Sequence, residues 1–335
     1  MIVRIAADWD TSSLLSQTPA SSGLWDGIHF TTSPVPECDL LVVLNNRHLQ
    51  DIRVRCPRAN VWCIIQEPYV PGLYDWMIEG LEPYSLVFTH HLPSTDPKFV
   101  PSHPALPWLI GRNYDELAAA PLPEKSQSIS WIASDLAFLP AHRHRRQLRQ
   151  YIHTHAPDLV HLYGRGIEFL PRKWDGLAPF RYSVCLENSV GPHLWSEKLA
   201  DCFLARTVPL YIGCTNLEEY FPPESFIRLP VADPPTVCAA IRQILATDDW
   251  SRRLPAIEAA RQCILERYQL FPFLVHQIQT RGLSPASKDD VLVPSYAAAR
   301  RRHRLRYLGA KIKNAEFAEM RDALISKGKY LWWSH

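Results

Sequence analysis

Short runs of apolar and β-branched residues recur along this 335-residue chain, and turn-rich or helical stretches separate them. In its first part the predicted strands are residues 2–6, 40–44, 61–65 and 85–89. Strands that are apolar throughout are typical of parallel sheets, because helices cover both faces of such sheets. Five prolines within residues 93–107 then predict an irregular connection.

The alternation starts again after residues 121–127, a plausible domain boundary. Here the predicted strands are residues 128–133, 159–163, 181–186 and 208–212. The predicted helices are residues 141–155, 195–205, 235–246 and 249–267. Two rounds of this pattern predict an α/β fold with two units, each built on a parallel sheet. Ligands are expected at the carboxyl ends of the strands, in the cleft between the units.

The composition, 47% apolar and 21% charged residues, is typical of a globular chain, and the net charge of +2 gives no argument for nucleic-acid binding. None of the eight cysteines forms a CxxC pair, so buried free thiols in a reducing compartment are expected rather than a zinc site. Residues 1–8 do not resemble a signal peptide, and no apolar run approaches the ~18–20 residues of a spanning helix. These features predict a cytoplasmic protein.

The last segment, residues 297–335, differs from the rest in charge. It holds ten Lys and Arg residues and three acidic residues, a net charge of +7, so residues 1–296 carry −5. Leu305, Leu308 and Ile312 share one face of a predicted helix, and the chain ends in aromatic residues. A basic amphipathic helix of this kind is typical of binding to an anionic membrane surface. The alternative is a helix that packs on the body of the protein and exposes its basic face.

The segment Tyr182–Lys198 carries the clearest chemical pattern. A buried strand brings Glu187 and Asn188 to its carboxyl end, and a helix begins close to Glu197. A helix N-terminus attracts anions through its free N–H groups, and Lys198 adds a charge suited to a diphosphate. The Glu197 carboxylate can accept hydrogen bonds from ribose hydroxyls. The pattern indicates a sugar-nucleotide pocket, with a local capping box and a surface ion pair as the alternative.

The run Glu187-Asn188-Ser189, the pair Glu197-Lys198 and the later segments 208–213 and 220–227 resemble the donor-binding region of the family 10 glycosyltransferases, the α1,3/4-fucosyltransferases. The resemblance implies a GT-B fold, in which two Rossmann-like α/β domains with parallel sheets face a cleft. It also implies GDP-fucose as the donor and inversion at the anomeric carbon. The expected organisation is an acceptor-binding domain (residues 1–120), a donor-binding domain (121–275) and a basic helical tail (276–335).

The resemblance also implies roles for individual residues. Lys198 and Arg145 would hold the diphosphate, with Arg143 and Arg146 as alternatives to Arg145. Glu197 would bind the ribose. The remaining donor-binding residues that the resemblance implies are Tyr163, Gly164, Arg181, Glu187, Asn188, Ser189 and Leu194.

Two departures from the family pattern concern the sugar rather than the nucleotide. The family usually has a tyrosine at the position of Leu194, and a leucine side chain cannot donate a hydrogen bond to a sugar. The family's usual Asp-Asp-Phe is replaced by residues 228–233, Arg-Leu-Pro-Val-Ala-Asp. GDP-fucose remains the expected donor, and another nucleotide sugar is the alternative, because losing a polar contact changes selectivity.

An inverting transfer by direct displacement needs a general base on the acceptor hydroxyl. Glu67 follows the apolar strand 61–65 and resembles the family's Glu-x-Pro position, so we predict that it is this base. Trp25 is a candidate lining of the acceptor groove, since aromatic rings stack on sugars. The rivals of Glu67 at other strand ends are Asp8, Asp10, His90 and His91.

No Asp-x-Asp motif follows a predicted strand in the expected donor-binding domain, residues 121–275, so we expect no essential metal ion and no cofactor beyond the nucleotide-sugar substrate. The absence of glycine-rich dinucleotide and P-loop motifs argues against dehydrogenases and P-loop enzymes. The predicted function is transfer of fucose to a glycan or glycolipid hydroxyl in surface polysaccharide or lipopolysaccharide assembly. A non-catalytic protein that binds nucleotide sugars or glycans is the alternative.

Overall fold

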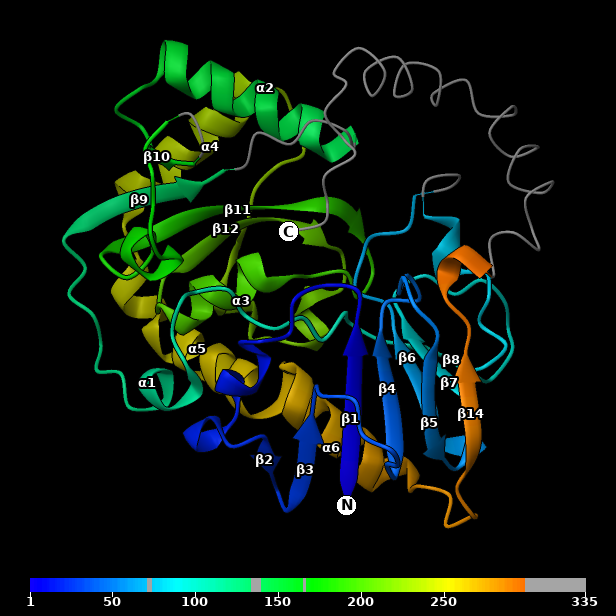
Figure 1. Cartoon of the computed structure of the whole chain (residues 1–335). Helices are drawn as coiled ribbons and strands as arrows, with labels where there is room; N and C mark the ends of the chain where they lie inside the picture. The colour runs from blue at the N-terminus through cyan, green and yellow to red at the C-terminus, as the bar shows by residue number, and fades with distance from the viewer. Residues whose placement is uncertain (71–73, 134–139, 165–166, 299–335) are drawn as a thin grey trace, which may run out of the picture.

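The computed structural model contains two α/β units, each built around its own sheet (Figure 1). The structure describes residues 1–70, 74–133, 140–164 and 167–298. The predicted membrane-binding segment, residues 297–335, lies outside the described residues except for its first two positions. Within the described ranges, no helix combines the length and apolar character needed to cross a bilayer.

The first unit contains a seven-stranded sheet with the order β2-β3-β1-β4-β6-β7-β8. Neighbouring strands are parallel, except that β2 and β3 form an antiparallel hairpin. The central strands β4 and β6 are buried along their whole length, as their apolar runs predict. The strands are β1 (Ile2–Ala7), β2 (Leu24–Trp25), β3 (Ile28–Thr31), β4 (Leu40–Leu44), β6 (Val61–Ile64), β7 (Leu86–Thr89) and β8 (Phe99–Pro101).

Two late segments of the chain return to this first unit. The helix α6 (Leu270–Arg281) packs its apolar side chains against one face of the seven-stranded sheet. The strand β14 (Asp289–Val293) pairs antiparallel with β5 (Ile52–Cys56) and closes the core on the other face. The sequence predicts a helical tail from residue 276, whereas the end of α6 and then β14 occupy the described part of that segment.

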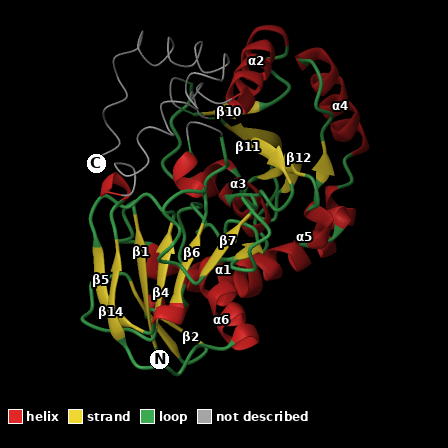
Figure 2. Ribbon diagram, turned by 90° about the vertical axis from the view of Figure 1, so that its right-hand side faces the viewer, coloured by secondary structure: helices red, strands yellow, loops and turns green. Residues whose placement is uncertain are grey.

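The second unit contains a five-stranded parallel sheet with the order β10-β9-β11-β12-β13. Its strands are β9 (Gln127–Ile132), β10 (His161–Tyr163), β11 (Phe180–Gly191), β12 (Val208–Cys214) and β13 (Ile227–Arg228). Its helices are α2 (Pro140–His155), α3 (Glu197–Leu204), α4 (Pro234–Thr247) and α5 (Trp250–Cys263). Figure 2 shows these helices around the second sheet and α6 beside the first.

Apolar side chains of α2 and α4 form one core with the second sheet, and those of α3 and α5 form another. The α2 core includes Leu148 and Ile152, the stripe that the sequence predicts for this helix. Two largely parallel sheets, of which the second has helices on both faces, confirm the predicted α/β fold of the GT-B type. All eight cysteines are free, and seven of them are buried, which confirms the expectation of packed thiols.

Two short elements link the units. The helix α1 (Tyr114–Ala118) begins with a complete capping box between Asn113 and Glu116. The π-helical turn η8 (Ile264–Tyr268) joins α5 to α6 and carries the chain back to the first sheet. Both elements lie at the seam between the units, and α6 then runs behind the strands of the first sheet in the view of Figure 1.

Candidate active site between the two sheets

Polar residues lie just beyond the carboxyl ends of three strands of the first sheet. They are Asp8 after β1, Asn45 after β4 and Gln66 after β6. The Asn45 side chain accepts a hydrogen bond from the Gln66 backbone N–H at 2.8 Å and donates one to Asp8 at 3.4 Å. These bonds join the strand ends into one edge, which also carries Glu67.

Glu67 lies between this edge and the second unit. Its side chain is exposed to solvent, but protein surrounds it on several sides, and this partial loss of hydration raises its pKa. The charges of Glu197 and Asp8 raise the pKa of Glu67 further, whereas Lys198 lowers it. Access to water limits the net rise. The predicted base is therefore within electrostatic reach of Glu197 and Lys198, which the sequence predicts to hold the donor.

The rivals of Glu67 lie at or near the same edge. Burial lowers the pKa of His90 to about 4, and so weak a base is poorly matched to proton abstraction at neutral pH. The His91 ring stacks on Tyr69 with the ring centroids 4.0 Å apart. The Asp10 carboxylate accepts hydrogen bonds from the backbone and hydroxyl of Ser12 in a local exposed turn. The surroundings of Glu67 fit the base better than those of these three rivals.

In the second unit, the start of α3 is fixed to the end of β11. The N-cap residue of α3, Ser196, accepts through its hydroxyl from the Lys198 backbone N–H at 3.3 Å. The Glu187 carboxylate in turn accepts from the Ser196 backbone N–H at 2.8 Å and from its hydroxyl at 2.6 Å. Because Glu187 is buried, it positions the helix start, and the predicted role as a direct donor contact is not supported.

Five charged side chains of alternating sign surround the start of α3. The Lys198 Nζ lies 3.3 Å from Glu197 and 3.7 Å from Glu187. The Lys173 Nζ lies 2.8 Å from Asp201 and 4.0 Å from Glu197. Burial disfavours the charge on Glu197, but Lys198 and Lys173 outweigh it and lower its pKa to about 2. Burial also opposes the charge on Lys198, but Glu197 and Glu187 raise its pKa.

The sequence interpretation missed Lys173 and Asp201. Lys173 belongs to a short 3-10 helix, Lys173–Gly176, and no motif around it indicates a role. Asp201 lies one helical turn after Glu197 and is 1% exposed, so its polar side chain interrupts an otherwise apolar face. Glu197 and Asp201 are four residues apart, a spacing that places two side chains on the same face of a helix. This spacing could have identified Asp201 from the sequence.

Of the three arginines considered for the diphosphate, Arg145 reaches the end of β11. It is buried on α2, and its guanidinium donates to the Asn188 side-chain oxygen at 3.0 Å. Arg146 is exposed on the same helix, and the side chain of Arg143 lies outside the described part of the chain. The structure thus brings together Arg145 and Asn188, as the resemblance implies.

The Tyr163-Gly164 pair closes β10. Gly164 has a φ of +146°, and a Cβ at this position would collide with the backbone oxygen of Ala133. Only glycine fits where the chain passes so close to the end of β9. The Tyr163 ring is buried and packs against Phe180, so its observed role is in the core.

The predicted donor role of Arg181 is wrong. Arg181 is the second residue of β11 and Asn188 lies near the other end, so roughly 23 Å of strand separates them. The Arg181 guanidinium instead pairs with Asp248 at 2.9 Å. Ser189 is half-buried at the correct end of the strand, and Leu194 is 8% exposed and apolar.

The loop between β11 and α3, where the sugar is expected, has further anchors that the sequence interpretation missed. The His193 backbone N–H donates to Asn216 at 2.7 Å, and its ring Nδ1 lies 2.7 Å from the Tyr220 hydroxyl. Trp195 stacks on His103, with the ring centroids 4.7 Å apart. His103 belongs to the connection between the units, so this stack ties the loop to the first unit.

Trp25 does not lie at this edge. It pairs with Ile28 at the turn of the β2–β3 hairpin, and β3 runs parallel to β1 with Ile2 opposite His29. Trp25 is therefore at the amino end of the sheet, whereas Glu67 follows the carboxyl end of β6. The prediction that Trp25 lines an acceptor groove beside Glu67 is wrong. Within the part of the chain that the structure describes, no group of three or more His, Cys, Asp or Glu side chains has a metal-binding arrangement.

The comparison with protein families confirms the resemblance of the donor-binding region. Residues 122–249, less than half of the chain, match the model described as Glycosyltransferase family 10 (fucosyltransferase) C-term. The hamster (Cricetulus griseus) protein named 4-galactosyl-N-acetylglucosaminide 3-alpha-L-fucosyltransferase 9 is 27% identical over 123 residues, 35% of this chain and 33% of the relative. Alpha-(1,3)-fucosyltransferase FucT of Helicobacter pylori is 30% identical over 53 residues, 16% of this chain and 11% of that protein. The chain thus matches at most about a third of these relatives.

Among solved structures, an alpha1,3-fucosyltransferase with GDP covers 80% of this chain and 92% of its own, with 14% identity and a TM-score of 0.46. An alpha-glucosyltransferase in complex with UDP-glucose and DNA containing an abasic site covers 82% and 98%, with 10% identity and a TM-score of 0.48. Both TM-scores are below 0.5. The roles of individual residues therefore rest on the geometry of this chain and on the family match.

Proposed function

We propose that the protein is an inverting glycosyltransferase that transfers fucose from GDP-fucose to a glycan hydroxyl. The observation that carries the proposal is that the charges of Glu197 and Lys198, from the second unit, act on the pKa of Glu67, which follows a strand end of the first unit. A transferase of this kind must bring a base and a donor grip together from two sides. The family match over residues 122–249 supports the donor half of the proposal.

In the proposed reaction, the Glu67 carboxylate takes the proton of the acceptor hydroxyl. The hydroxyl oxygen then forms a bond to the anomeric carbon as the bond from that carbon to the diphosphate oxygen breaks. The electron pair of the broken bond leaves with GDP. Lys198, Arg145 and the N-terminus of α3 would stabilise the charge that develops on the leaving diphosphate.

The charge network around α3 defines what the donor must do on binding. Without a ligand, Lys198 already pairs with two carboxylates, so a diphosphate has to share or displace these pairs. Arg145 is held in place by Asn188 and offers a second cationic group. We therefore expect donor affinity to depend on both Lys198 and Arg145, and Glu197 to contribute through the ribose.

The sugar specificity of the site depends on the loop between β11 and α3. Leu194 is buried and apolar at the position where the family usually has tyrosine, which favours a second candidate, a nucleotide sugar other than GDP-fucose. The relatives are named for a galactosyl-N-acetylglucosaminide, so N-acetyllactosamine is the first acceptor to test. We propose surface polysaccharide or lipopolysaccharide assembly as the setting.

A panel of nucleotides tests the proposal. We expect GDP and GDP-fucose to raise the melting temperature of the protein, because a ligand that binds only the folded state stabilises it. UDP, CMP and dTDP should have much smaller effects. Equal responses to GDP and UDP would contradict the GDP assignment. Lys198→Ala should abolish the GDP response, whereas Lys98→Ala, in the turn before β8 of the first unit, is the matched control and should retain it.

Transfer itself separates an enzyme from a binding protein. With GDP-fucose and N-acetyllactosamine, release of GDP in proportion to fucosylated product supports the transferase. A chain that binds GDP-fucose but releases no GDP with any acceptor in a glycan panel would support the alternative, a non-catalytic binding protein. We propose that transfer needs no metal ion, so activity should survive excess EDTA; its loss and recovery with Mg²⁺ or Mn²⁺ would refute this part.

A further inference from the structure

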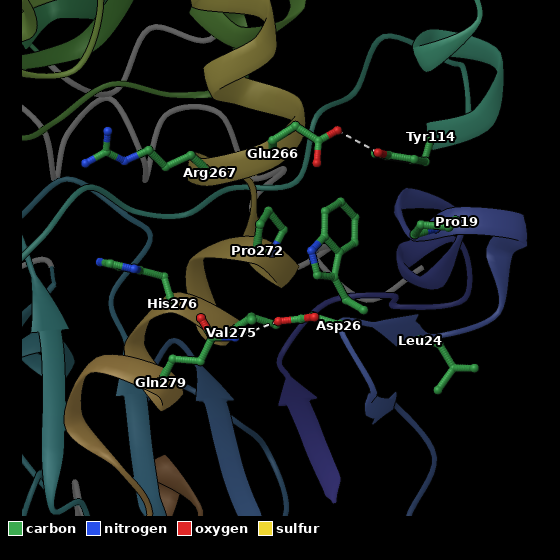
Figure 3. A pocket seen from close by; sticks show the side chains of 11 residues that line it. Pro19, Leu24, Asp26, Tyr114, Glu266, Arg267, Pro272, Val275, His276 and Gln279 are labelled. Atoms are coloured by element: carbon green, nitrogen blue, oxygen red, sulfur yellow. Dashed lines mark hydrogen bonds between the residues drawn. The ribbon is translucent and has the colours of Figure 1, made fainter.

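A hollow of about 770 Å³ lies at the seam between the two units, away from Glu67 (Figure 3). The turn of the β2–β3 hairpin forms one wall, α1 another, and the η8–α6 segment the third. Because the hairpin turn is at the amino end of the first sheet, the length of β1 separates this hollow from the Glu67 edge. For the six residues of β1 that length is roughly 20 Å.

Two aromatic rings provide apolar surface in the hollow. Trp25 and Tyr114 meet edge to face, with the ring centroids 5.1 Å apart and the planes at 80°. Both side chains are half-buried, so the contact leaves part of each ring accessible. An accessible indole beside a phenol provides apolar surface for the C–H face of a pyranose ring.

Paired polar groups surround these rings. The Tyr114 hydroxyl donates to the Glu266 carboxylate at 2.6 Å, and the Gln279 amide donates to Asp26 at 2.6 Å (Figure 3). Asp26, Glu266 and Gln279 are exposed, so their remaining acceptor positions are open to sugar hydroxyls. Two carboxylates, Asp26 and Glu266, and one arginine, Arg267, line this hollow, and a second arginine, Arg281, lines the hollow next to it. This balance favours a neutral ligand over a nucleotide or another polyanion.

A second hollow of about 220 Å³ lies next to the first, and the two share Arg267 and His276 as lining residues. Both hollows lie along α6, and we call them together the seam groove. The second hollow is also lined by His103 and Tyr220. The His103 ring is 3% exposed, and its Nε2 has no hydrogen-bond partner among the described residues. The groove is thus longer than a single sugar requires.

We propose that this seam groove is a second glycan-binding site, which takes neutral sugar units of a long chain. The proposal rests on the proposed function for the choice of glycan and for the other contact of the chain, at the Glu67 edge, whereas the groove shares no residue with the donor grip. Binding at two places on one chain makes the second contact intramolecular, so affinity for long chains should exceed that for short ones. Trp25, Glu266 and Gln279 would be the main contacts.

The test is binding of N-acetyllactosamine oligomers of two, four and six sugars to the full chain, by calorimetry and by saturation-transfer NMR. We expect the six-sugar oligomer to bind at least about tenfold more tightly than the two-sugar unit. Gln279→Ala, Glu266→Gln and the double variant should remove this length dependence. The matched control Gln150→Ala, an exposed glutamine on α2, should retain it. Trp25→Ala is a further variant, judged only if its melting curve shows a folded protein.

The outcomes separate the two proposals. Equal affinity for all lengths in the unaltered protein, or length dependence retained in the double variant, would overturn the seam site. If GDP binds normally in these cases, the transferase proposal stands without it. If the double variant loses the length dependence and GDP binds to neither protein, the seam site stands and the donor proposal fails. A sialylated six-sugar oligomer that binds more tightly than the neutral one would overturn the assignment to neutral sugars.

Discussion

At the scale of single residues, Glu67 combines exposure to solvent with a raised pKa. Replacing its carboxylate by the amide in Glu67→Gln removes the base but keeps the size of the side chain. We expect transfer to fall by roughly 10²–10⁴-fold, while GDP affinity changes little. Since the carboxylate must be ionised to act, kcat/KM should fall as the pH drops through a value above the ordinary glutamate pKa. An unchanged rate in this variant would contradict the assignment, and Glu124→Gln, exposed on the second unit, is the control.

His103 allows a prediction about stability. Burial lowers its pKa to about 3, whereas an imidazole in the unfolded chain titrates near ~6.5. Between these values the unfolded state binds more protons, so His103 makes the folded state progressively less stable as the pH falls from about 6.5 towards 3. His103→Phe should make the free energy of unfolding less dependent on pH in that window. His29→Phe, at an exposed position, should leave the dependence as it is; an equal slope in the His103→Phe protein would contradict the prediction.

At the scale of elements, the donor grip depends on how closely β12 approaches β11. A Cβ at Gly213 would collide with the Glu187 side chain, which holds the start of α3 through Ser196. Gly213→Ala should therefore cost about 1–3 kcal/mol of unfolding free energy and weaken GDP binding. At Gly191, at the end of β11, an added Cβ meets no atom within 4 Å, so Gly191→Ala is the matched control. Equal melting temperatures and GDP affinities for the two variants would refute this coupling.

Local patterns predict most of the helices and strands, because a short apolar run indicates a buried strand without any knowledge of its partner strands. The strand predicted over 40–44 is observed as β4 (Leu40–Leu44), and the helix over 141–155 as α2 (Pro140–His155). Pairing between distant segments is harder to predict. The alternation of β5 could have indicated a strand, but nothing in it indicates β14 as its partner, because that pairing depends on the path of the whole chain.

The same contrast between local patterns and distant contacts applies to the candidate site. A strand-to-helix motif is local, so the pattern predicts that Glu187, Glu197 and Lys198 lie together, and they do. Arg181 belongs to the same motif but lies at the opposite end of β11, because position along a strand decides which edge a side chain reaches. Lys173 enters the network from a short 3-10 helix without a recognisable sequence pattern, so only the structure could identify it.

At the scale of the whole molecule, charge is unevenly divided between the body and the end of the chain. Residues 297–335 carry a net +7 and the remainder −5. We propose that this segment holds the protein on an anionic membrane surface, where each Lys or Arg near the surface contributes about 1 kcal/mol. An acidic body alone would be repelled by the same surface, so deletion of residues 297–335 should abolish binding rather than only weaken it.

Liposome sedimentation tests this division. The full chain should bind vesicles that contain 30% phosphatidylserine and should dissociate from them as the salt concentration is raised towards 0.5 M. It should not bind vesicles of phosphatidylcholine alone. The chain ending at residue 296 should bind neither kind of vesicle, but GDP should still raise its melting temperature. Replacing the four arginines 300, 301, 302 and 304 by glutamine separates charge from apolar contact: a large loss of binding supports electrostatic attachment. Undiminished binding by the truncated chain would refute a surface role for the segment and favour the alternative, a helix packed on the body.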